Sequence, residues 1–349
     1  MDNTIVVSTP PHVKSKRTTR GIMIDVCIAL APAAIAGCVF FGWQALMIIL
    51  MSVFACVATE FVYYFIQNKG FAHKCADAAS VCKRFIKQFD FTSVVTGLIL
   101  ALILPTTDKW YEVFYEVLIG GIFSIAIVKM LFGGTGKNLV NPAAAGRVFM
   151  FISFSVVTYV TCNIGYIGDS GTLETGATNL STLLGANATS TEGLLDLFLG
   201  TGIAGCIGET CKAAILLGYV YLAARQVIKW WQPLLFLAVF GFTAVLMSGF
   251  SYESGYKFDI ELFLPHILSG GVLFGVIFMF TDYTTSPKGV YGQLFYYVVA
   301  AILVAVLRYL TKVEVTSFVI LLMNLVVPLI DKYFIRKPFG YKKAKKEGK

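Results

Sequence analysis

Several polar stretches interrupt a mostly apolar sequence, and two of them carry groups that could bind a ligand. The first, GGTGKNLVNPAAAGR (133–147), combines a run of glycines with Lys137 and the amides of Asn138 and Asn141. Backbone N–H groups exposed by glycines, an ammonium and two amides suit a phosphate or the edge of a polar heterocycle. The spacing does not match a P-loop, in which Gly-Lys-Ser/Thr follows a strand. A tight turn between two membrane helices, with Pro142 starting the second, would explain the same residues.

The second polar stretch, TDYTTSPKG (281–289), offers the carboxylate of Asp282, several hydroxyl groups and Lys288. A hydroxyl-rich break at membrane depth could line an ion path or a ligand pocket. It could equally cap the helix that precedes it. Both interpretations remain open from the sequence.

Ionisable residues inside the apolar segments form a further set of candidates, because a charge buried in lipid is costly unless it has a task or a partner. They are Asp25, Glu60, Lys129, Glu209 and Lys212. Glu60 is the deepest acid without a partner in its own predicted helix, so it is the strongest candidate for handling a cation. Asp25 and Lys129 are predicted to lie near enough to a membrane boundary to reach water. Glu209 and Lys212 are three residues apart and could pair on one helix face.

A third polar stretch, LETGATNLSTL (173–183), raises a different possibility, namely modification by another enzyme. Thr178 follows Gly176 and Ala177, so its hydroxyl group is predicted to be easy to reach. An unaided threonine hydroxyl is a poor nucleophile and no histidine lies nearby, so no self-contained hydrolase is indicated. An acceptor site, a glycosylated loop and an ordinary loop all remain compatible with these residues.

The sequence indicates no metal centre. The eight cysteines contain no CxxC pair, which argues against a disulfide framework and an iron–sulfur signature. His73, Cys75 and Cys82 lack a fourth ligand.

The elements that must position these groups are membrane helices. Hydrophobic residues make up 57% of the 349 residues and charged residues only 14%, and the mean hydropathy is +0.76. This composition is typical of an integral membrane protein. We predict an all-α fold with ten transmembrane helices, near residues 21–41, 44–66, 91–106, 113–131, 143–161, 194–224, 232–250, 261–281, 290–310 and 314–335.

The distribution of lysine and arginine orients the predicted helices. Basic residues gather at both ends of the chain and in every even-numbered break, which places both termini in the cytoplasm. Arg308 and Lys312 are the main exceptions on the opposite side. The net charge of +8 therefore fits membrane topology and anionic lipid better than a nucleic-acid partner.

The same pattern divides the chain into two halves. Gly120-Gly121 matches Gly270-Gly271 in sequence context, and FDFTSVV (89–95) resembles KFDIELF (257–263). Five predicted helices per half, an odd number, would give the two halves opposite orientations, as in inverted-repeat transporters. The predicted regions are a cytoplasmic basic tail, a first five-helix repeat, an extracytoplasmic loop, a second five-helix repeat and a second basic tail, at residues 1–20, 21–161, 162–193, 194–335 and 336–349.

Three stretches, GGTGKNLVNPAAAGRVF, TGATNL and FTDYTTSPKGVYGQ, together resemble one protein family. It comprises the D subunit of the Rnf complex, a bacterial ion-pumping ferredoxin:NAD⁺ oxidoreductase, and the B subunit of the Na⁺-translocating NADH:quinone reductase. The resemblance covers nearly the whole chain. It implies a component of a redox-driven translocase in the bacterial cell membrane, with no self-contained catalytic site.

The resemblance also implies cofactors. In that family the last threonine of a Ser/Thr-Gly-Ala-Thr motif carries FMN through a phosphodiester bond, made outside the cytoplasm by an FAD-dependent flavin transferase. Carried over, the acceptor is Thr178, preceded by Gly176 and Ala177. Glu174 and Asn179 depart from the residues common at those positions. Relatives in the quinone reductase also hold a non-covalent riboflavin, for which the NLVN element (138–141), beside Lys137, is the matching stretch.

The implied mechanism is electron relay through flavin, coupled to a path for Na⁺ or H⁺. The candidates for that path are Glu60, Asp25 and Asp282. The implied partners are the A, B, C, E and G components of the Rnf complex, the flavin transferase and the lipid bilayer. A solute channel resembling urea or ammonium channels is the alternative from another class, since fold does not fix function. The B component of the quinone reductase is a further alternative, although the short basic N-terminal tail favours Rnf.

Overall fold

The computed structural model describes residues 17–67, 78–106, 110–154, 193–200, 205–249 and 259–334. Within these ranges the regular secondary structure is helical and no β-strand occurs, which agrees with the predicted all-α class. Gly176, Ala177 and Thr178 lie outside the described residues.

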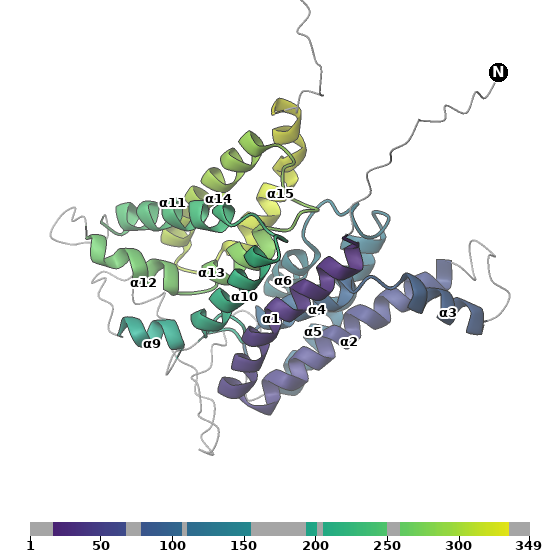
Figure 1. Cartoon of the computed structure of the whole chain (residues 1–349). Coiled ribbons are helices and arrows are strands. Elements are labelled where there is room, and N and C mark those ends of the chain that lie inside the picture. The colour runs from purple at the N-terminus through teal and green to yellow at the C-terminus, as the bar shows by residue number, and fades with distance from the viewer. Residues whose placement is uncertain are drawn as a thin grey trace, which may run out of the picture.

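The helices form two groups along the chain (Figure 1). The first helix group contains α1 (Thr19–Phe41), α2 (Trp43–Phe65), α3 (Ala78–Gln88), α4 (Thr92–Leu102), α5 (Trp110–Ile122), the π-helical η2 (Phe123–Met130) and α6 (Pro142–Ser153). The second contains α9 (Leu194–Leu199), α10 (Lys212–Ala224), α11 (Trp231–Ser248), the 3₁₀ turn η4 (Ile260–Leu262), α12 (Phe263–Leu268), α13 (Val272–Gly275), the π-helical η5 (Val276–Phe280), α14 (Val290–Thr311) and α15 (Thr316–Tyr333).

Several of these helices are long and apolar enough to cross a bilayer. Six qualify on their own within the described residues: α1, α2, α5 continued by η2, α11, α14 and α15. Two helix pairs qualify together but are sharply bent, by 69° between α3 and α4 and by 67° between α12 and α13. The chain is therefore a multi-pass membrane protein, and the part of it that the structure describes contains six to eight such spans. Helix α10 is a shorter apolar helix.

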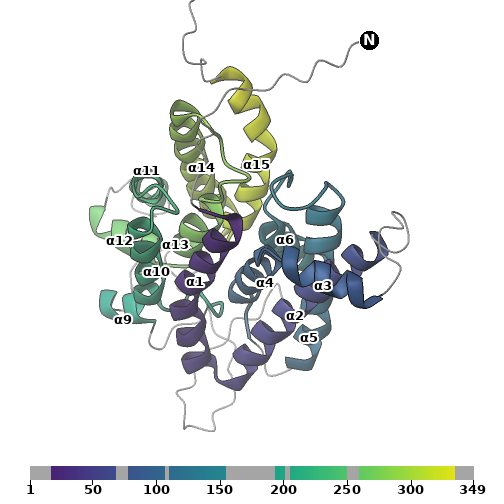
Figure 2. The ribbon, with the colours of Figure 1, turned by 45° about the vertical axis from the view of Figure 1, so that its right-hand side comes forward.

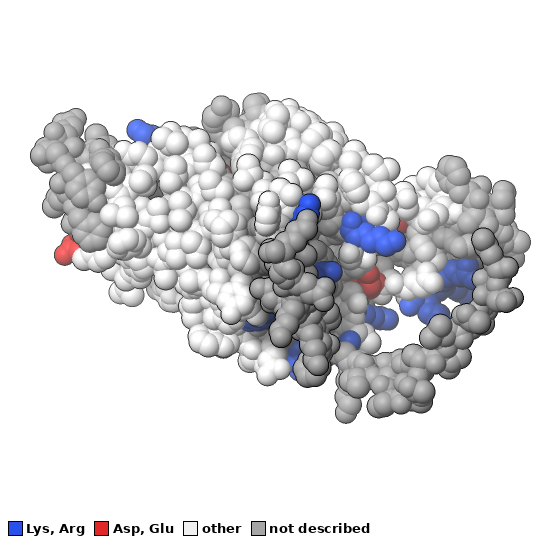
Figure 3. Space-filling model, turned by 90° about the horizontal axis from the view of Figure 1, so that it is seen from above, with Lys and Arg blue, Asp and Glu red and all other residues white. Residues whose placement is uncertain are grey.

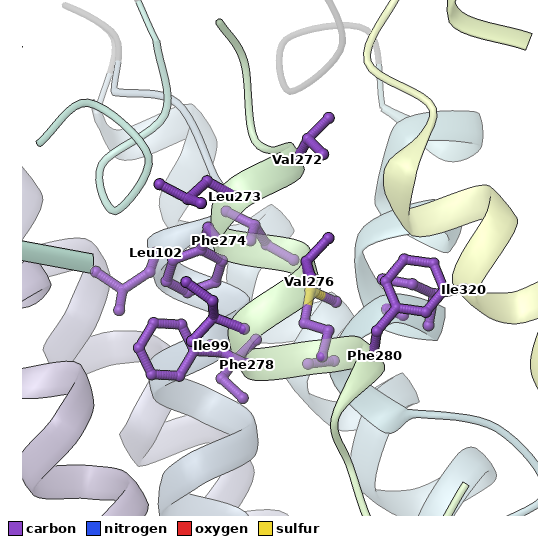
Figure 4. Packing of buried hydrophobic residues seen from close by; sticks show 14 of the residues in the cluster. Ile99, Leu102, Val272, Leu273, Phe274, Val276, Phe278, Phe280 and Ile320 are labelled. Atoms are coloured by element: carbon purple, nitrogen blue, oxygen red, sulfur yellow. The ribbon is translucent and has the colours of Figure 1, made fainter. Parts of the chain in front are cut away.

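The second members of the two bent pairs lie in the interior. Most residues of α4 and all residues of α13 and η5 are buried. Figure 4 shows side chains of α13 and η5 packed between Ile99 and Leu102 of α4 and Ile320 of α15. An element that is apolar on all sides needs protein on all sides, and the surrounding long helices provide it.

Helix α1 joins the two groups, since it packs against α10 on one side and against α4 on the other (Figure 2). Glycine allows the close approach to α10. A Cβ atom on Gly218 would lie 2.3 Å from the backbone oxygen of Ala29. Small residues at such crossings let helix backbones pack directly in membranes.

Two predictions about these elements were wrong. The basic segment before residue 88 contains the helix α3, not only a loop, because its apolar side packs on α2: Phe85 meets Phe61 with ring centroids 5.2 Å apart. The predicted helix 194–224 is broken between α9 and α10. There the N–H groups of Ile207 and Gly208 donate to the carbonyls of Leu104 and Leu102, at 3.0 and 2.7 Å.

The two glycine pairs that match in sequence have different surroundings in the structure. Gly120 and Gly121 lie inside α5, where Gly120 packs against Met150. Gly270 and Gly271 instead form the bend between α12 and α13, and Gly270 has a φ of 70°. The corresponding bend between α3 and α4 uses Phe91, with a φ of 65°.

One face of the molecule is basic. Figure 3 views the end at which α1 begins and α15 finishes, and Lys and Arg side chains gather over its middle and right-hand parts. The rest of the visible described surface is largely uncharged.

Candidate functional site

A pocket opens where the two polar stretches meet, between the first and second helix groups. It encloses about 810 Å³ not occupied by protein atoms, part of it open to solvent. Its polar lining comes from Thr92, Thr96, Lys129, Thr135, Asn138, Asn141, Thr281, Asp282 and Thr284. Its apolar lining includes Ile22, Met23, Val26, Val95, Ile99, Leu222, Ile277 and Phe278.

The residues of the first polar stretch have three different roles. The side-chain oxygen of Asn138 is buried and has no hydrogen-bond partner among the described residues. The side-chain oxygen of Asn141 instead accepts from the N–H groups of Ala143 and Ala144, at 3.0 and 3.4 Å, and caps α6. Lys137 is exposed and does not line the pocket. Of the three predicted ligand-binding residues, only Asn138 has a free acceptor at the pocket.

Lys129 and Glu60 form a buried ion pair beside the pocket. The Lys129 ammonium lies 2.8 Å from a carboxylate oxygen of Glu60, and the two side chains are 1% and 12% exposed. The ammonium also donates to the hydroxyls of Thr92 and of Ser93, the latter at 3.1 Å. Ser93 in turn donates to the other Glu60 oxygen. The sequence predicted Glu60 as a candidate but placed Lys129 in reach of water, which is wrong.

Asp90 extends this network at the bend before α4. Its carboxylate accepts from the Thr92 hydroxyl at 2.6 Å and from the Thr135 hydroxyl at 2.8 Å. Thr135 belongs to the glycine-rich stretch, so these bonds tie the first polar stretch to the bend. These hydrogen bonds hold in place the part of the pocket wall that contains Lys129.

Asp282 lies on the pocket wall that the second helix group provides. Its carboxylate accepts from the hydroxyls of Thr284 and Thr285, at 2.8 and 3.3 Å. Burial raises the pKa of Asp282 above the ordinary range for an aspartate, and these hydrogen bonds oppose that rise. The second polar stretch therefore both forms a turn of its own and lines the pocket.

Asp25 is not at the pocket. It accepts from Tyr221 at 3.1 Å and pairs with Arg225 at 3.2 Å, which joins α1 to the end of α10. Its side chain is 15% exposed, so an ion pair across the α1–α10 contact shields it.

A second buried cation, Arg308, lies at the other bend and is 2% exposed. It donates to the backbone carbonyls of His266 and Ser269, at 3.1 and 2.6 Å, and pairs with Glu314 at 3.4 Å. Sequence reasoning missed this cluster. The signal was the exception that Arg308 made to the charge distribution.

Glu209 and Lys212 do not pair through their charged groups as predicted. The Lys212 ammonium donates to the backbone carbonyls of Glu209 and of Gly270, the latter at 3.1 Å. The Glu209 carboxylate accepts from the N–H of Cys206 at 3.0 Å. Both residues therefore support the irregular segment before α10.

The family comparison agrees with the three sequence stretches. The model of the NQR2, RnfD, RnfE family matches residues 6–340. The chain belongs to this family. That membership favours a component of a redox complex over the alternative of a solute channel.

Relatives resemble the chain over almost its full length. The D subunit of the Na⁺-translocating ferredoxin:NAD⁺ oxidoreductase complex of Acetobacterium woodii is 36% identical over 348 residues, which are 99% of this chain and 98% of the relative. Its counterpart in the proton-translocating complex of Clostridium ljungdahlii is 32% identical over 348 residues, 97% of each chain. The counterpart in the ion-translocating oxidoreductase complex of Stutzerimonas stutzeri is 32% identical over 351 residues, 91% of each chain.

Proposed function

We propose that this chain is the D-type membrane component of an ion-translocating ferredoxin:NAD⁺ oxidoreductase in a bacterial cell membrane. Near full-length similarity to relatives that bear this name supports the assignment. These relatives are D-type components, which favours Rnf over the quinone-reductase alternative. One relative translocates Na⁺ and another protons, so family membership alone does not choose the ion.

The pocket is the site that we assign to a non-covalent flavin. An isoalloxazine ring has one edge rich in hydrogen-bonding groups and one methylated apolar edge. The pocket lining includes both kinds of group: hydroxyls and the free acceptor of Asn138, and apolar side chains such as Val26, Ile99 and Ile277. When bound, a flavin supplies one- and two-electron transfer. The chain's own residues would hold and orient it. The free acceptor at the meeting point of both polar stretches is the observation that carries this assignment.

The pocket assignment can be tested through Asn138. Asn138→Leu removes the free acceptor while keeping the size of the side chain similar. Leu139→Ala is a matched control, because Leu139 is exposed and does not line the pocket. Flavin released from the purified, denatured complex should fall at least tenfold in the Asn138 variant and stay unchanged in the control. Equal flavin in both variants would remove the pocket assignment.

We also propose a covalent FMN at Thr178, outside the cytoplasm. Denatured protein, produced with the flavin transferase, should give a flavin-fluorescent band that Thr178→Val abolishes. Thr182→Val is the control, since it removes a hydroxyl from the same stretch (173–183) outside the motif. A fluorescent band in Thr178→Val would contradict the assignment.

The two helix groups are proposed to be inverted five-helix repeats. In this arrangement α1 corresponds to α10, α2 to α11, the bent pair α3–α4 to α12–α13, α5 with η2 to α14, and α6 to α15. Similar bends of 69° and 67° support it. So do contacts that match under this correspondence, since α2 packs on α3 and α5, and α11 packs on α12 and α14. Counting α6 and α10 as spans gives the ten that the sequence predicts.

The ion path is proposed to involve Glu60, which lies beside the pocket, and Asp282, which lies on the pocket wall. Asp25 is a weaker candidate after its pairing with Arg225. The closeness of Glu60 to the pocket, through Lys129, is what suggests coupling between an electron carrier and an ion.

A further inference from the structure

Lys129 touches two environments at once. It contributes to the lining of the pocket, and its ammonium is bound by Glu60, Thr92 and Ser93. Glu60 and Ser93 do not line the pocket. Among the described cationic side chains, Lys129 alone contributes to that lining, so it is the charged link between the pocket and Glu60.

The ammonium occupies a set of oxygens that would also suit a small cation. An ammonium has three N–H donors, and here they meet one carboxylate oxygen and two hydroxyl oxygens. Carboxylates and other oxygens are the ligands that hard cations take. The second Glu60 oxygen is held by Ser93, which keeps the carboxylate and one hydroxyl together whether or not the ammonium is present.

Two carboxylates contribute negative charge to this network. Glu60 pairs with Lys129 directly, and Asp90 accepts from the Thr92 hydroxyl, which in turn accepts from the ammonium. The two carboxylates face a single ammonium. An added monovalent cation would balance them, whereas an added anion would not.

We propose that the oxygens of Glu60, Ser93 and Thr92 form a monovalent-cation site for which the Lys129 ammonium competes. Negative charge in the pocket draws the ammonium toward the pocket, and a cation takes its place at Glu60. Lys129 thereby makes the binding of negative charge in the pocket and of a cation at Glu60 mutually favourable, since coupling of two binding sites is reciprocal. The pocket half of this inference rests on the proposed function, while the cation site itself does not require a flavin.

The cation site is tested by binding of ²²Na⁺ to the purified complex, at constant ionic strength maintained with choline. Lys129→Gln removes the competing ammonium and should strengthen Na⁺ binding by roughly tenfold or more. Lys129→Gln combined with Glu60→Gln should lose that gain, because the carboxylate is gone. Lys332→Gln is the control, since Lys332 is exposed on α15 and does not line the pocket. It should bind Na⁺ like the wild type.

The pocket link is tested with a carboxylate placed in the pocket. Asn138→Asp should strengthen Na⁺ binding when Lys129 is present and leave it unchanged in the Lys129→Gln background. An equal effect in both backgrounds would contradict the link through Lys129. The Asn138→Asp experiment does not require bound flavin. The amount of flavin released from the same preparations therefore tests the proposed function separately.

A proton could occupy the site in place of Na⁺. The infrared band of a protonated carboxyl group should then appear in Lys129→Gln and vanish in the double variant. If Lys129→Gln produces neither tighter Na⁺ binding nor this band in monodisperse complex, the proposal is overturned. Tight Na⁺ binding that survives Glu60→Gln would also overturn it.

Discussion

Lys129 and Arg308 are buried cations that each lie beside a bent helix pair, one in each helix group, yet they bind different partners. Each lies near the end of a long helical segment, η2 or α14, and bonds to the bend of the neighbouring helix pair. Each is followed six residues later by a residue of the same network, Thr135 or Glu314. Arg308 donates to two backbone carbonyls. Lys129 bonds only side-chain oxygens in the described network.

Because of this difference, we expect Arg308 to hold its partners rigidly and Lys129 to make a contact that can change. A planar guanidinium holds several acceptors in fixed directions, whereas an ammonium is a compact charge on a flexible stem. Carbonyls at a bend cannot leave without unfolding it, so Arg308 secures the backbone between α12 and α13. The hydroxyls and carboxylate around Lys129 can accept another cation. We therefore expect Arg308 to stabilise the backbone at its bend, and Lys129 to exchange with another cation at the other bend.

The largest effect is expected for Arg308→Gln. The change leaves Glu314 without its cation and the carbonyls of His266 and Ser269 without their donor. Removing one partner of a buried ion pair typically costs about 3–5 kcal/mol. The complex should lose thermal stability in detergent, measured by the temperature at which this chain aggregates. An aggregation temperature equal to that of the wild type would contradict this stabilising role of Arg308.

Lys129→Gln should cost less, about 1–3 kcal/mol, because Glu60 can take up another cation or a proton. Lys129→Gln with Glu60→Gln should recover most of the loss, since two neutral groups often replace a buried ion pair at little cost. The same aggregation temperatures, with and without added NaCl, provide the measurement. Equal losses of stability in Lys129→Gln and Arg308→Gln would contradict the proposed difference between the two buried cations.

A smaller effect is expected at the two left-handed residues that form the bends. Gly270→Ala should destabilise by about 1–2 kcal/mol for the backbone alone. Its Cβ atom would also lie 2.3 Å from Glu314 and 2.5 Å from Arg308, which forces that ion pair to shift. Phe91→Gly relieves the backbone but loses a ring contact with Phe89 at 5.1 Å, so it should be nearly neutral. If Phe91→Gly lowered the stability more than Gly270→Ala does, the two left-handed residues would not limit stability through backbone strain.

The smallest expected effect is on the pH dependence of the folding stability. Because burial raises the pKa of Asp282, the folded protein binds a proton there more readily than the unfolded chain. Stability from this group therefore falls as pH rises from about 3.9, the unfolded value, through the raised folded value. Asp282→Asn should flatten that part of the profile. An unchanged pH profile of the aggregation temperature would show that Asp282 is not responsible.

The sequence was informative where a single segment carries its own signal. Composition predicted the membrane class, and the two polar stretches that it singled out both line the pocket. The cap formed by Asn141 also had a local signal, because Asn followed by Pro is typical of a helix start. That signal shows why Asn141 has a structural bond where Asn138 has none.

The pairings could not be predicted because they join distant parts of the chain. Lys129 and Glu60 are 69 residues apart, and Arg308 meets the carbonyl of His266 across 42 residues. No periodicity within one helix reports such contacts. The bends were missed as well, for two different reasons. The segment before Phe91 is basic, so no membrane helix was predicted there. The segment around Gly270 looks like one apolar helix in sequence and is broken only by that left-handed residue.

An experimental cryo-EM map of the complex, purified with its native cofactors, tests the central claim most directly. The account predicts a planar three-ring density in the pocket beside Asn138, with Lys129 on the adjoining wall. It predicts no such density at Arg308. A pocket filled by lipid or by protein side chains, with Lys129 still bonded to Glu60, would contradict the claim that this site holds the flavin.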